Sequence, residues 1–199
     1  MGYSVAIDGP AGAGKSTIAK QIAKKMNFIY VDTGAMYRAM ALFLIRNNVA
    51  ADEKDKIEEI CKEAKITIEY RNGEQVVLLD GENVNGLIRT EEVGNMASAS
   101  SVNGEVRKKL VALQQELAKS AEVIMDGRDI GTCVLPGANV KVYLTADPKV
   151  RAKRRFDELT AKGEVCDIII SSFFLCMFRG IFHAFSQDNW NRRKHVQYN

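Results

Sequence analysis

The chain has 199 residues, of which 46% are hydrophobic and 27% are charged, a balance typical of a globular protein with one domain and a modest insertion. Its formal net charge is only +3, so attraction to anions must come from local clusters of Arg and Lys, and we expect no nucleic-acid partner. Because no apolar run reaches the roughly 18 residues that a transmembrane helix needs, we also expect no membrane partner.

The four cysteines indicate the redox environment of the protein. They show neither CxxC spacing nor the density of a disulfide-bonded scaffold: Cys61, Cys133, Cys166 and Cys176. The first residues carry no basic segment followed by an apolar stretch, the pattern of a secretory signal. We therefore predict structural thiols and a cytoplasmic location, and we expect the protein to be a monomer.

Residues 1–48 alternate strands with helices. Residues 3–8 form an apolar run typical of a buried strand, and a glycine-rich loop follows it. The next apolar positions recur at the spacing of a helix: Ala19, Ile22, Ala23 and Met26. A second strand is predicted over residues 28–32, followed by a helix that ends at about Arg46. Strands that alternate with helices predict a parallel sheet.

The stretch from residue 49 to residue 103 breaks this alternation. Apolar and polar side chains alternate over residues 66–70, as in a half-buried strand. Asn72-Gly73 then supplies the positive φ angles of a tight hairpin turn, and a second apolar strand follows. We therefore predict that residues 49–103 are an inserted small antiparallel sheet flanked by helices.

Residues 104–167 return to the α/β pattern. A helix is predicted from an Asn103 cap, and strands are predicted over residues 122–126 and 140–144. Asp147-Pro148 then begins a further helix, which Gly163 would end. The predicted fold class is thus α/β, with a three-layer core whose parallel sheet carries helices on both faces, plus the inserted antiparallel sheet.

The loop after the first strand matches G-x-x-x-x-G-K-[ST] between a predicted strand and a predicted helix, which is the context this motif requires. Its amide groups and the helix N-terminus suit phosphate oxygens, Lys15 can reach the β- and γ-phosphates, and Ser16 can bind Mg²⁺. This context disfavours a mere glycine-rich turn. We assign ATP to the whole loop: Gly9, Pro10, Ala11, Gly12, Ala13, Gly14, Lys15, Ser16 and Thr17.

The motif is shared by GTPases, motor ATPases and small-molecule kinases, so other residues must separate these classes. A GTPase needs a guanine-reading N/T-K-x-D after a strand, and neither LTADPK nor LTAKGE provides it. A motor usually places a second acid after the strand-end aspartate, whereas Asp126 is followed by Gly-Arg-Asp. These absences favour a small-molecule kinase.

Arginines follow two of the predicted strands, where a parallel sheet opens its binding crevice. Arg38 lies shortly after the second strand, and Arg128 with Asp129 directly after the third. A guanidinium can bind phosphate oxygens bidentately and offset charge during transfer, so we predict a second phosphate here. The alternative for each arginine taken alone is an ordinary surface ion pair.

Two further groups have both a functional and a structural interpretation. Asp126 ends an apolar strand and could support Mg²⁺ through water, or it could accept hydrogen bonds from loop N–H groups. Arg151, Arg154 and Arg155 share one face of the helix that begins near residue 148. That face is either simply solvated or a lid whose arginines close over the transferring phosphate.

The chain resembles the bacterial cytidylate kinases over residues 3 to about 167. The resemblance is carried by GPAGAGKST, YVDTGAMYR, the hairpin insertion, IRTEEVGNMASASSVNGEVR and MDGRDIGTCVLP. It implies transfer of phosphate from ATP to CMP or dCMP with Mg²⁺. It also implies a P-loop nucleoside-monophosphate-kinase core, in which residues 49–103 are an enlarged monophosphate-binding domain.

The resemblance also implies roles for individual residues. Thr33 and Arg38 match positions near the acceptor sugar and phosphate, and Arg128 matches a phosphate-binding arginine. The positions that would read cytosine are Ser98, Arg107 and Asp129. The predicted catalytic set is Lys15, Arg38, Arg128, Arg151 and Arg155, and Ser16 and Asp126 form the predicted metal site.

Residues 168–199 depart from this family. Its members continue with a charged lid containing R-D-x-x-D-x-x-R and a final strand and helix, whereas this chain reads IIISSFFLCMFRGIFHAFSQDNWNRRKHVQYN. A reading-frame change, a truncated or fused copy, or a lineage-specific tail would each produce this pattern, and a break inside a predicted helix favours the first two. We expect (d)CMP kinase activity impaired by the tail. The alternatives are a nucleotide-binding module without turnover and another small-molecule P-loop kinase.

Overall fold

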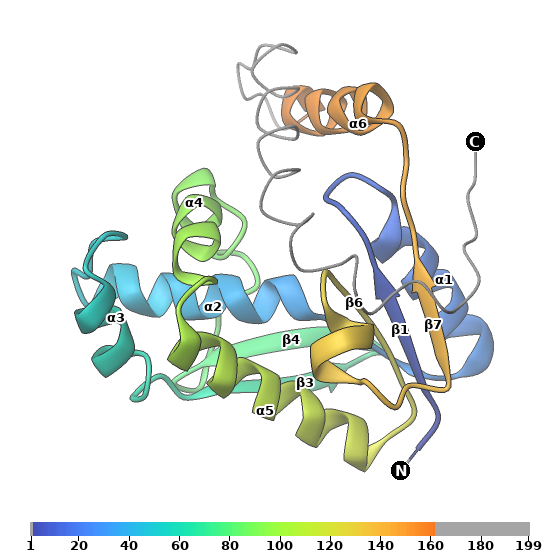
Figure 1. Ribbon diagram of the computed structural model, residues 1–199, viewed down its shortest axis with the longest axis horizontal. Coiled ribbons are helices and arrows are strands. Elements are labelled where there is room, and N and C mark those ends of the chain that lie inside the picture. Colours follow the sequence, from blue (N-terminus) through green and yellow to red (C-terminus); the bar gives the residue numbers. More distant parts are fainter. Residues whose placement is uncertain (1, 162–199) are drawn as a thin grey trace.

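The core of the protein is a parallel four-stranded sheet in the order β2-β6-β1-β7 (Figure 1). The computed structural model describes residues 2–161. The strands are β1 (Ser4–Asp8), β2 (Ile29–Asp32), β6 (Val123–Gly127) and β7 (Val140–Tyr143). Because all four run parallel, their carboxyl ends meet at one edge of the sheet, where the predicted site residues lie.

Helices cover both faces of this sheet. Successive side chains of a strand point to opposite faces, so Val5 and Ile7 of β1 pack with α1 (Lys15–Met26), while Ala6 packs with α2 (Thr33–Arg46) and α5 (Gly104–Ser120). Strand β6 divides its side chains in the same way. The three-layer α/β fold expected from the sequence is confirmed.

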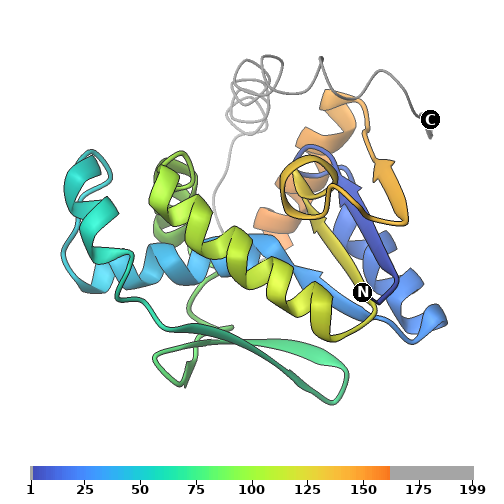
Figure 2. The same ribbon diagram turned by 60° about the horizontal axis from the view of Figure 1, so that its bottom comes forward.

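The insertion contains a second sheet of three antiparallel strands (Figure 2). Its strands are β3 (Ile66–Arg71), β4 (Glu74–Leu79) and β5 (Glu82–Asn83). The Asn72-Gly73 turn has the expected positive φ angles, 55° and 79°. Along the chain, helix α3 (Lys54–Ile60) precedes the sheet and helix α4 (Glu91–Ser100) follows it. Buried side chains of this segment share one hydrophobic core with α2 and α5, and its separation as a domain stays a prediction.

The predicted helix caps are present. The Asn103 side chain accepts hydrogen bonds from the N–H groups of Glu105 and Val106, and α5 begins beside it. Asp147 accepts from the N–H of Lys149 at 2.8 Å at the start of α6 (Pro148–Ala161). The predicted stop at Gly163 and the tail from residue 168 lie outside the described residues.

One segment differs from the sequence-based prediction. The stretch after β6 was expected to be a loop, but residues Ile130–Val134 form one turn of π-helix. Its first two N–H groups donate to the side chain of Asp8, at the end of the neighbouring strand β1. These bonds between distant residues stabilise the turn, and the local sequence therefore did not predict it. Among the helices that the structure describes, none has the length and apolar character of a membrane span.

Candidate active site

The phosphate loop connects β1 to α1 at the carboxyl edge of the sheet, as the motif requires. Gly9 has a φ of 146°, and a Cβ added there would lie 1.9 Å from the carbonyl oxygen of Leu144. Gly14 has a φ of 93° and immediately precedes α1. Only glycine meets both requirements, close backbone approach and positive φ, so the loop depends on these two residues.

Lys15 is folded back onto its own loop. Its Nζ donates to the carbonyl oxygen of Pro10 at 2.9 Å, and the side chain is half-buried. Burial lowers the pKa of Lys15, an effect that the nearby carboxylate of Asp126 opposes. Among the described hydrogen bonds, the ammonium group therefore has one acceptor, a neutral carbonyl oxygen, and negatively charged phosphate oxygens would be stronger acceptors.

Asp126 is held by two hydroxyl groups at the end of β6. The Ser16 hydroxyl donates to its Oδ2 at 2.8 Å, and the Tyr30 hydroxyl donates to its Oδ1 at 2.8 Å. The residue is only 5% exposed, and burial, followed by the like charge of Asp32, raises its pKa. Among the described residues, the Asp126 side chain thus accepts only from hydroxyl groups. The structural alternative, in which it would accept from backbone N–H groups of the following loop, is not found, because Asp8 accepts from those groups.

The backbone N–H groups of the segment after β6 donate to the side chain of Asp8. Its Oδ1 accepts from the N–H of Ile130 at 2.7 Å, and its Oδ2 accepts from the N–H of Gly131 at 2.8 Å. Asp8 is 2% exposed, and burial raises its pKa while these two bonds oppose the shift. Asp8 thus joins the end of the phosphate-loop strand to the segment that carries Arg128 and Asp129.

The residues at the predicted metal site fit Mg²⁺. Ser16 and Asp126 offer the oxygen ligands that Mg²⁺ prefers, and Ser16 Oγ lies 2.8 Å from Asp126 Oδ2. Within residues 2–161, no group of three or more His, Cys, Asp and Glu side chains is placed to hold a metal by itself. Mg²⁺ normally binds through one or two protein groups together with substrate phosphates and water, so this sparse donor set is the expected one.

Three arginines gather beside the end of β2. Arg89 forms an ion pair with Asp32 at 2.8 Å, and Asp32 also accepts from the N–H of Ala35 at the start of α2. Burial, followed by the like charge of Arg89, lowers the pKa of Arg38. Desolvation by surrounding protein, followed by the like charge of Arg38, lowers the pKa of Arg128, although its surface is largely exposed. A bound anion would relieve this crowding of positive charge.

The predicted base-reading residues are brought together only in part. Arg107 of α5 forms an ion pair with Asp129, directly after β6. Burial raises the pKa of Tyr37 to about 12, and the charges of this pair act on it, so Tyr37 lies nearby. Ser98 is exposed on α4, and its hydroxyl donates to the carbonyl oxygen of Gly94 in the same helix. Among the described contacts, none joins Ser98 to the pair.

Thr33 lies at the predicted acceptor side but is 4% exposed. Its hydroxyl donates to the carbonyl oxygen of Asp126 at 2.8 Å and so ties the start of α2 to β6. A contact of this hydroxyl with a sugar would have to replace or share that bond.

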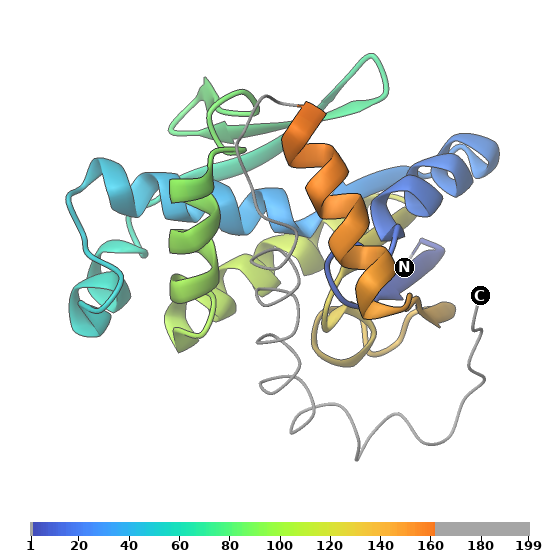
Figure 3. The ribbon, with the colours of Figure 1, turned by 90° about the horizontal axis from the view of Figure 1, so that it is seen from above.

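Helix α6 lies over the phosphate loop (Figure 3). Arg151 is 6% exposed and donates to the carbonyl oxygens of Ala146 and Ala11 at 3.2 and 3.3 Å. Arg154 donates to the carbonyl oxygen of Gly12 at 3.1 Å, whereas Arg155 pairs with Glu158 on the exposed side. The three arginines are therefore not equivalent, because two hold the loop, whereas Arg155 is paired with Glu158 and the charges of both act on Arg38 at the acceptor side.

Several residues of this site were missed by sequence reasoning. Asp8 and Asp32 end apolar strands at the binding edge, and that position could have identified them. The other three carry no local signal, because their partners are distant in sequence: Tyr30, Gln75 and Arg89. Gln75 exchanges two hydrogen bonds with the backbone of Asp32, so the inserted hairpin is docked on the edge strand β2.

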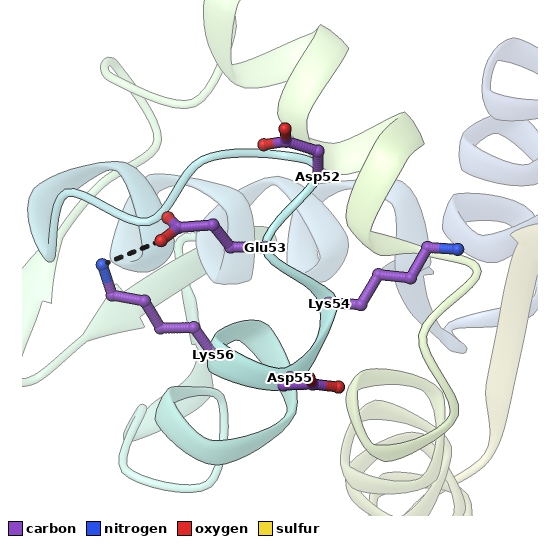
Figure 4. Close-up of a pocket in the computed structure, with 5 residues that line it drawn as sticks. All are labelled: Asp52, Glu53, Lys54, Asp55 and Lys56. Carbon is purple, nitrogen blue, oxygen red and sulfur yellow. Dashed lines mark hydrogen bonds and ion pairs between the residues drawn. The ribbon is translucent and has the colours of Figure 1, made fainter.

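A surface pocket at the start of α3 lies apart from these residues (Figure 4). It is lined by Asp52, Glu53, Lys54, Asp55 and Lys56. Glu53 and Lys56 pair across it at 3.5 Å, and both side chains are exposed. None of the predicted site residues lines this pocket, and we assign no ligand to it.

The chain is similar in sequence to curated cytidylate kinases. The cytidylate kinase of Caldicellulosiruptor saccharolyticus is 54% identical over 164 residues, which cover 82% of this chain and 73% of that protein. The cytidylate kinase of Bacillus subtilis is 46% identical over 160 residues, which cover 80% of this chain and 71% of that protein. A solved structure of shikimate kinase from Bacteroides thetaiotaomicron aligns with 99% of this chain and with 85% of the shikimate kinase chain. Its TM-score of 0.47 and sequence identity of 15% are too low to support an assignment.

The sequence profile of the cytidylate kinase family matches residues 5–170. This match includes the phosphate loop, the insertion and the Arg107–Asp129 pair, and it ends close to the point at which the tail departs from the family pattern. The chain therefore belongs to the cytidylate kinase family.

Proposed function

We propose that this protein transfers the γ-phosphate of ATP to CMP or dCMP and so forms CDP or dCDP. The observation that carries the proposal is the meeting of two sets of residues at one edge of the sheet. The phosphate loop follows β1, and the Arg107–Asp129 pair lies at the end of the adjacent strand β6. Asp8 joins the two sets through its bonds to Ile130 and Gly131.

On the donor side, the amides of residues 9–17 and the N-terminus of α1 would bind the ATP phosphates. Lys15 would exchange the Pro10 carbonyl for phosphate oxygens. Mg²⁺, when bound through Ser16 and Asp126, would neutralise charge on the phosphates. Because Arg151 and Arg154 donate to carbonyl oxygens of the loop, they would keep its amides turned toward the nucleotide.

On the acceptor side, the donors and acceptors of the protein complement cytosine. The amino group of cytosine is a donor, and its carbonyl oxygen and ring nitrogen are acceptors. Asp129 would accept from the amino group, while Arg107 would donate to the acceptors, with Ser98 as a further donor after a change in its hydroxyl bond. Arg38 and Arg128 would bind the acceptor phosphate, since their mutual repulsion favours an anion between them.

A second candidate function is a nucleotide-binding module with little turnover. It is favoured by one observation, the replacement of the family's charged lid by an apolar and then polar tail after residue 167. We propose that the tail slows transfer without preventing ATP binding. We also propose a cytoplasmic monomer, in line with the free thiols of Cys61 and Cys133.

A coupled assay with CMP, dCMP, UMP and AMP as acceptors tests these proposals together. We expect ATP-dependent turnover with CMP and dCMP, and much less with UMP and AMP. A preference for UMP or AMP would overturn the substrate assignment. ATP binding by calorimetry without turnover on any acceptor would instead favour the binding module.

A further inference from the structure

Tyr30 contacts the predicted metal site from the edge strand β2. In the parallel pairing of β2 with β6, Tyr30 lies directly opposite Ile124, and Asp126 is two residues further along β6. Side chains two apart on a strand share a face, and a long aromatic side chain reaches such a diagonal neighbour. The Tyr30 hydroxyl accordingly donates to Oδ1 of Asp126 at 2.8 Å.

The two oxygens of the Asp126 carboxylate have separate partners. Tyr30 occupies Oδ1, and the Ser16 hydroxyl donates to Oδ2 at 2.8 Å. Because each oxygen has its own donor, rotation of the carboxylate would break one of the bonds. The Ser16 proton is directed at Asp126, so the lone pairs of its oxygen remain available to a cation.

The remaining contacts hold Tyr30 in place. Its backbone carbonyl accepts from the Tyr70 hydroxyl at 3.1 Å, and Lys20 of α1 lies 5.5 Å from the centre of its ring. The hydroxyl is thus aimed at Asp126 by contacts with the inserted hairpin and with the first helix. The Tyr30 hydroxyl also lies within hydrogen-bonding reach of Ser16, so it sits beside both groups of the predicted metal site.

We propose that Tyr30 is a positioning residue for the metal site, where its hydroxyl fixes the Asp126 carboxylate so that Oδ2 stays directed at Ser16, the residue with which Asp126 would hold Mg²⁺. This inference rests on the proposed function, in which Ser16 and Asp126 support the metal. Hydrogen-bond partners of groups that bind a metal set their orientation, and their loss typically lowers metal affinity or activity by about 10-fold to 100-fold.

Tyr70 provides a matched control. Tyr70→Phe and Tyr30→Phe each remove one half-buried hydroxyl and one hydrogen bond at the same edge strand. They differ in the acceptor, which is a backbone carbonyl for Tyr70 and the Asp126 carboxylate for Tyr30. A general loosening of β2 would affect both variants, whereas loss of carboxylate orientation would affect only Tyr30→Phe.

The experiment measures ATP affinity of the full chain by calorimetry, once with Mg²⁺ and once with EDTA, and compares the ratio of the two dissociation constants. We expect Tyr30→Phe to reduce the contribution of Mg²⁺ about 10-fold and to leave ATP binding in EDTA unchanged. Tyr70→Phe should leave the ratio unchanged. In an Asp126→Asn background, Tyr30→Phe should have no further effect, since it acts through that carboxylate.

Three results would overturn the inference alone: a wild-type ratio in Tyr30→Phe, an equal fall in Tyr70→Phe, or an undiminished effect of Tyr30→Phe in the Asp126→Asn background. If Asp126→Asn itself leaves the ratio unchanged, the metal role of Asp126 is wrong and the inference falls with it. The phosphorylation of CMP is judged separately by the coupled assay, so failure of the activity and failure of the Tyr30 role are distinguishable.

Discussion

The donor side and the acceptor side of this site are held in different ways. On the donor side, the side chains bond to the phosphate loop itself: Lys15 to Pro10, Arg151 to Ala11 and Arg154 to Gly12. On the acceptor side, the charged groups pair with one another, Arg107 with Asp129 and Arg89 with Asp32. The donor side is therefore shaped before ATP binds, whereas the acceptor side must exchange protein ion pairs for contacts with substrate.

This difference has an energetic consequence. A contact with ATP on the donor side replaces a single neutral acceptor, so a large share of its energy appears as binding. On the acceptor side, CMP must first weaken the Arg107–Asp129 ion pair, which costs free energy. Only a base with matching hydrogen-bond donors and acceptors recovers that free energy. The acceptor side is thus expected to set selectivity, and the donor side the affinity for ATP.

The largest expected effect is on the donor side. Lys15→Ala should lower turnover by about 10³-fold or more and weaken ATP binding, because the ammonium group offsets charge on the transferring phosphate. The melting temperature should change little, since Lys15 is half-buried and, within residues 2–161, its ammonium group donates to one backbone carbonyl, that of Pro10. Lys24→Ala, an exposed lysine in the last turn of α1, is the matched control. Near wild-type turnover in Lys15→Ala would remove the phosphate-loop assignment.

The next largest effect concerns the tail, which lies outside the described residues. Replacement of the residues after Asp167 by a family lid, strand and helix should raise turnover by up to about 10³-fold, because the lid contributes arginines to the transferring phosphate. It should also raise the melting temperature, since the added strand would cover an edge of the parallel sheet. Equal turnover and equal melting temperature in the two proteins would show that the natural tail is a working part.

On the acceptor side, Asp129→Ala should weaken CMP binding by about 1 to 3 kcal/mol, or roughly 5-fold to 150-fold. The loss arises because the amino group of cytosine has no acceptor and Arg107 has lost its partner. ATP affinity should stay unchanged, because Asp129 has no bond to the phosphate loop among the described contacts. Calorimetric titration of both nucleotides checks this, and an unchanged CMP affinity would show that Asp129 does not read the base.

The smallest expected effect lies away from both sides, in α5. Gln114 is 1% exposed, and within the described part of the chain neither polar atom of its side chain has a hydrogen-bond partner. Gln114→Leu should therefore stabilise the protein by about 1 kcal/mol in urea unfolding. Gln115→Leu should destabilise it by about 1 kcal/mol, because Gln115 donates to the carbonyl oxygen of Val134. A loss of stability in Gln114→Leu would indicate a partner for that amide.

The features that could be predicted are those whose signals are local, and they occur on both sides of the site. The phosphate loop, the Asn72-Gly73 turn and the Asn103 cap each lie within a few consecutive residues, and each is found where the sequence indicates. The ends of the four strands of the parallel sheet were correct to about one residue. The second hairpin strand was predicted over VVLLD but begins two residues earlier, at Glu74, and the short strand β5 was not predicted.

The remaining features depend on contacts between distant residues. The π-helix after β6 is stabilised by Asp8, which lies 122 residues away from Ile130. Tyr30 and Asp126 are 96 residues apart, and Arg89 and Asp32 are 57 apart. No local pattern encodes such pairs, because they arise only when the strands are placed side by side. The resemblance to a family named Arg107 and Asp129, but it gave no sign that they pair with each other.

The most direct test of the account is a comparison of CMP and UMP binding to the wild-type protein by calorimetry. Uracil presents a carbonyl oxygen where cytosine presents an amino group, so it would turn an acceptor toward Asp129 and leave the Arg107–Asp129 pair without compensation. We predict that CMP binds more tightly than UMP by on the order of 100-fold or more. Equal affinity for the two nucleotides would contradict the central claim that this ion pair reads the base.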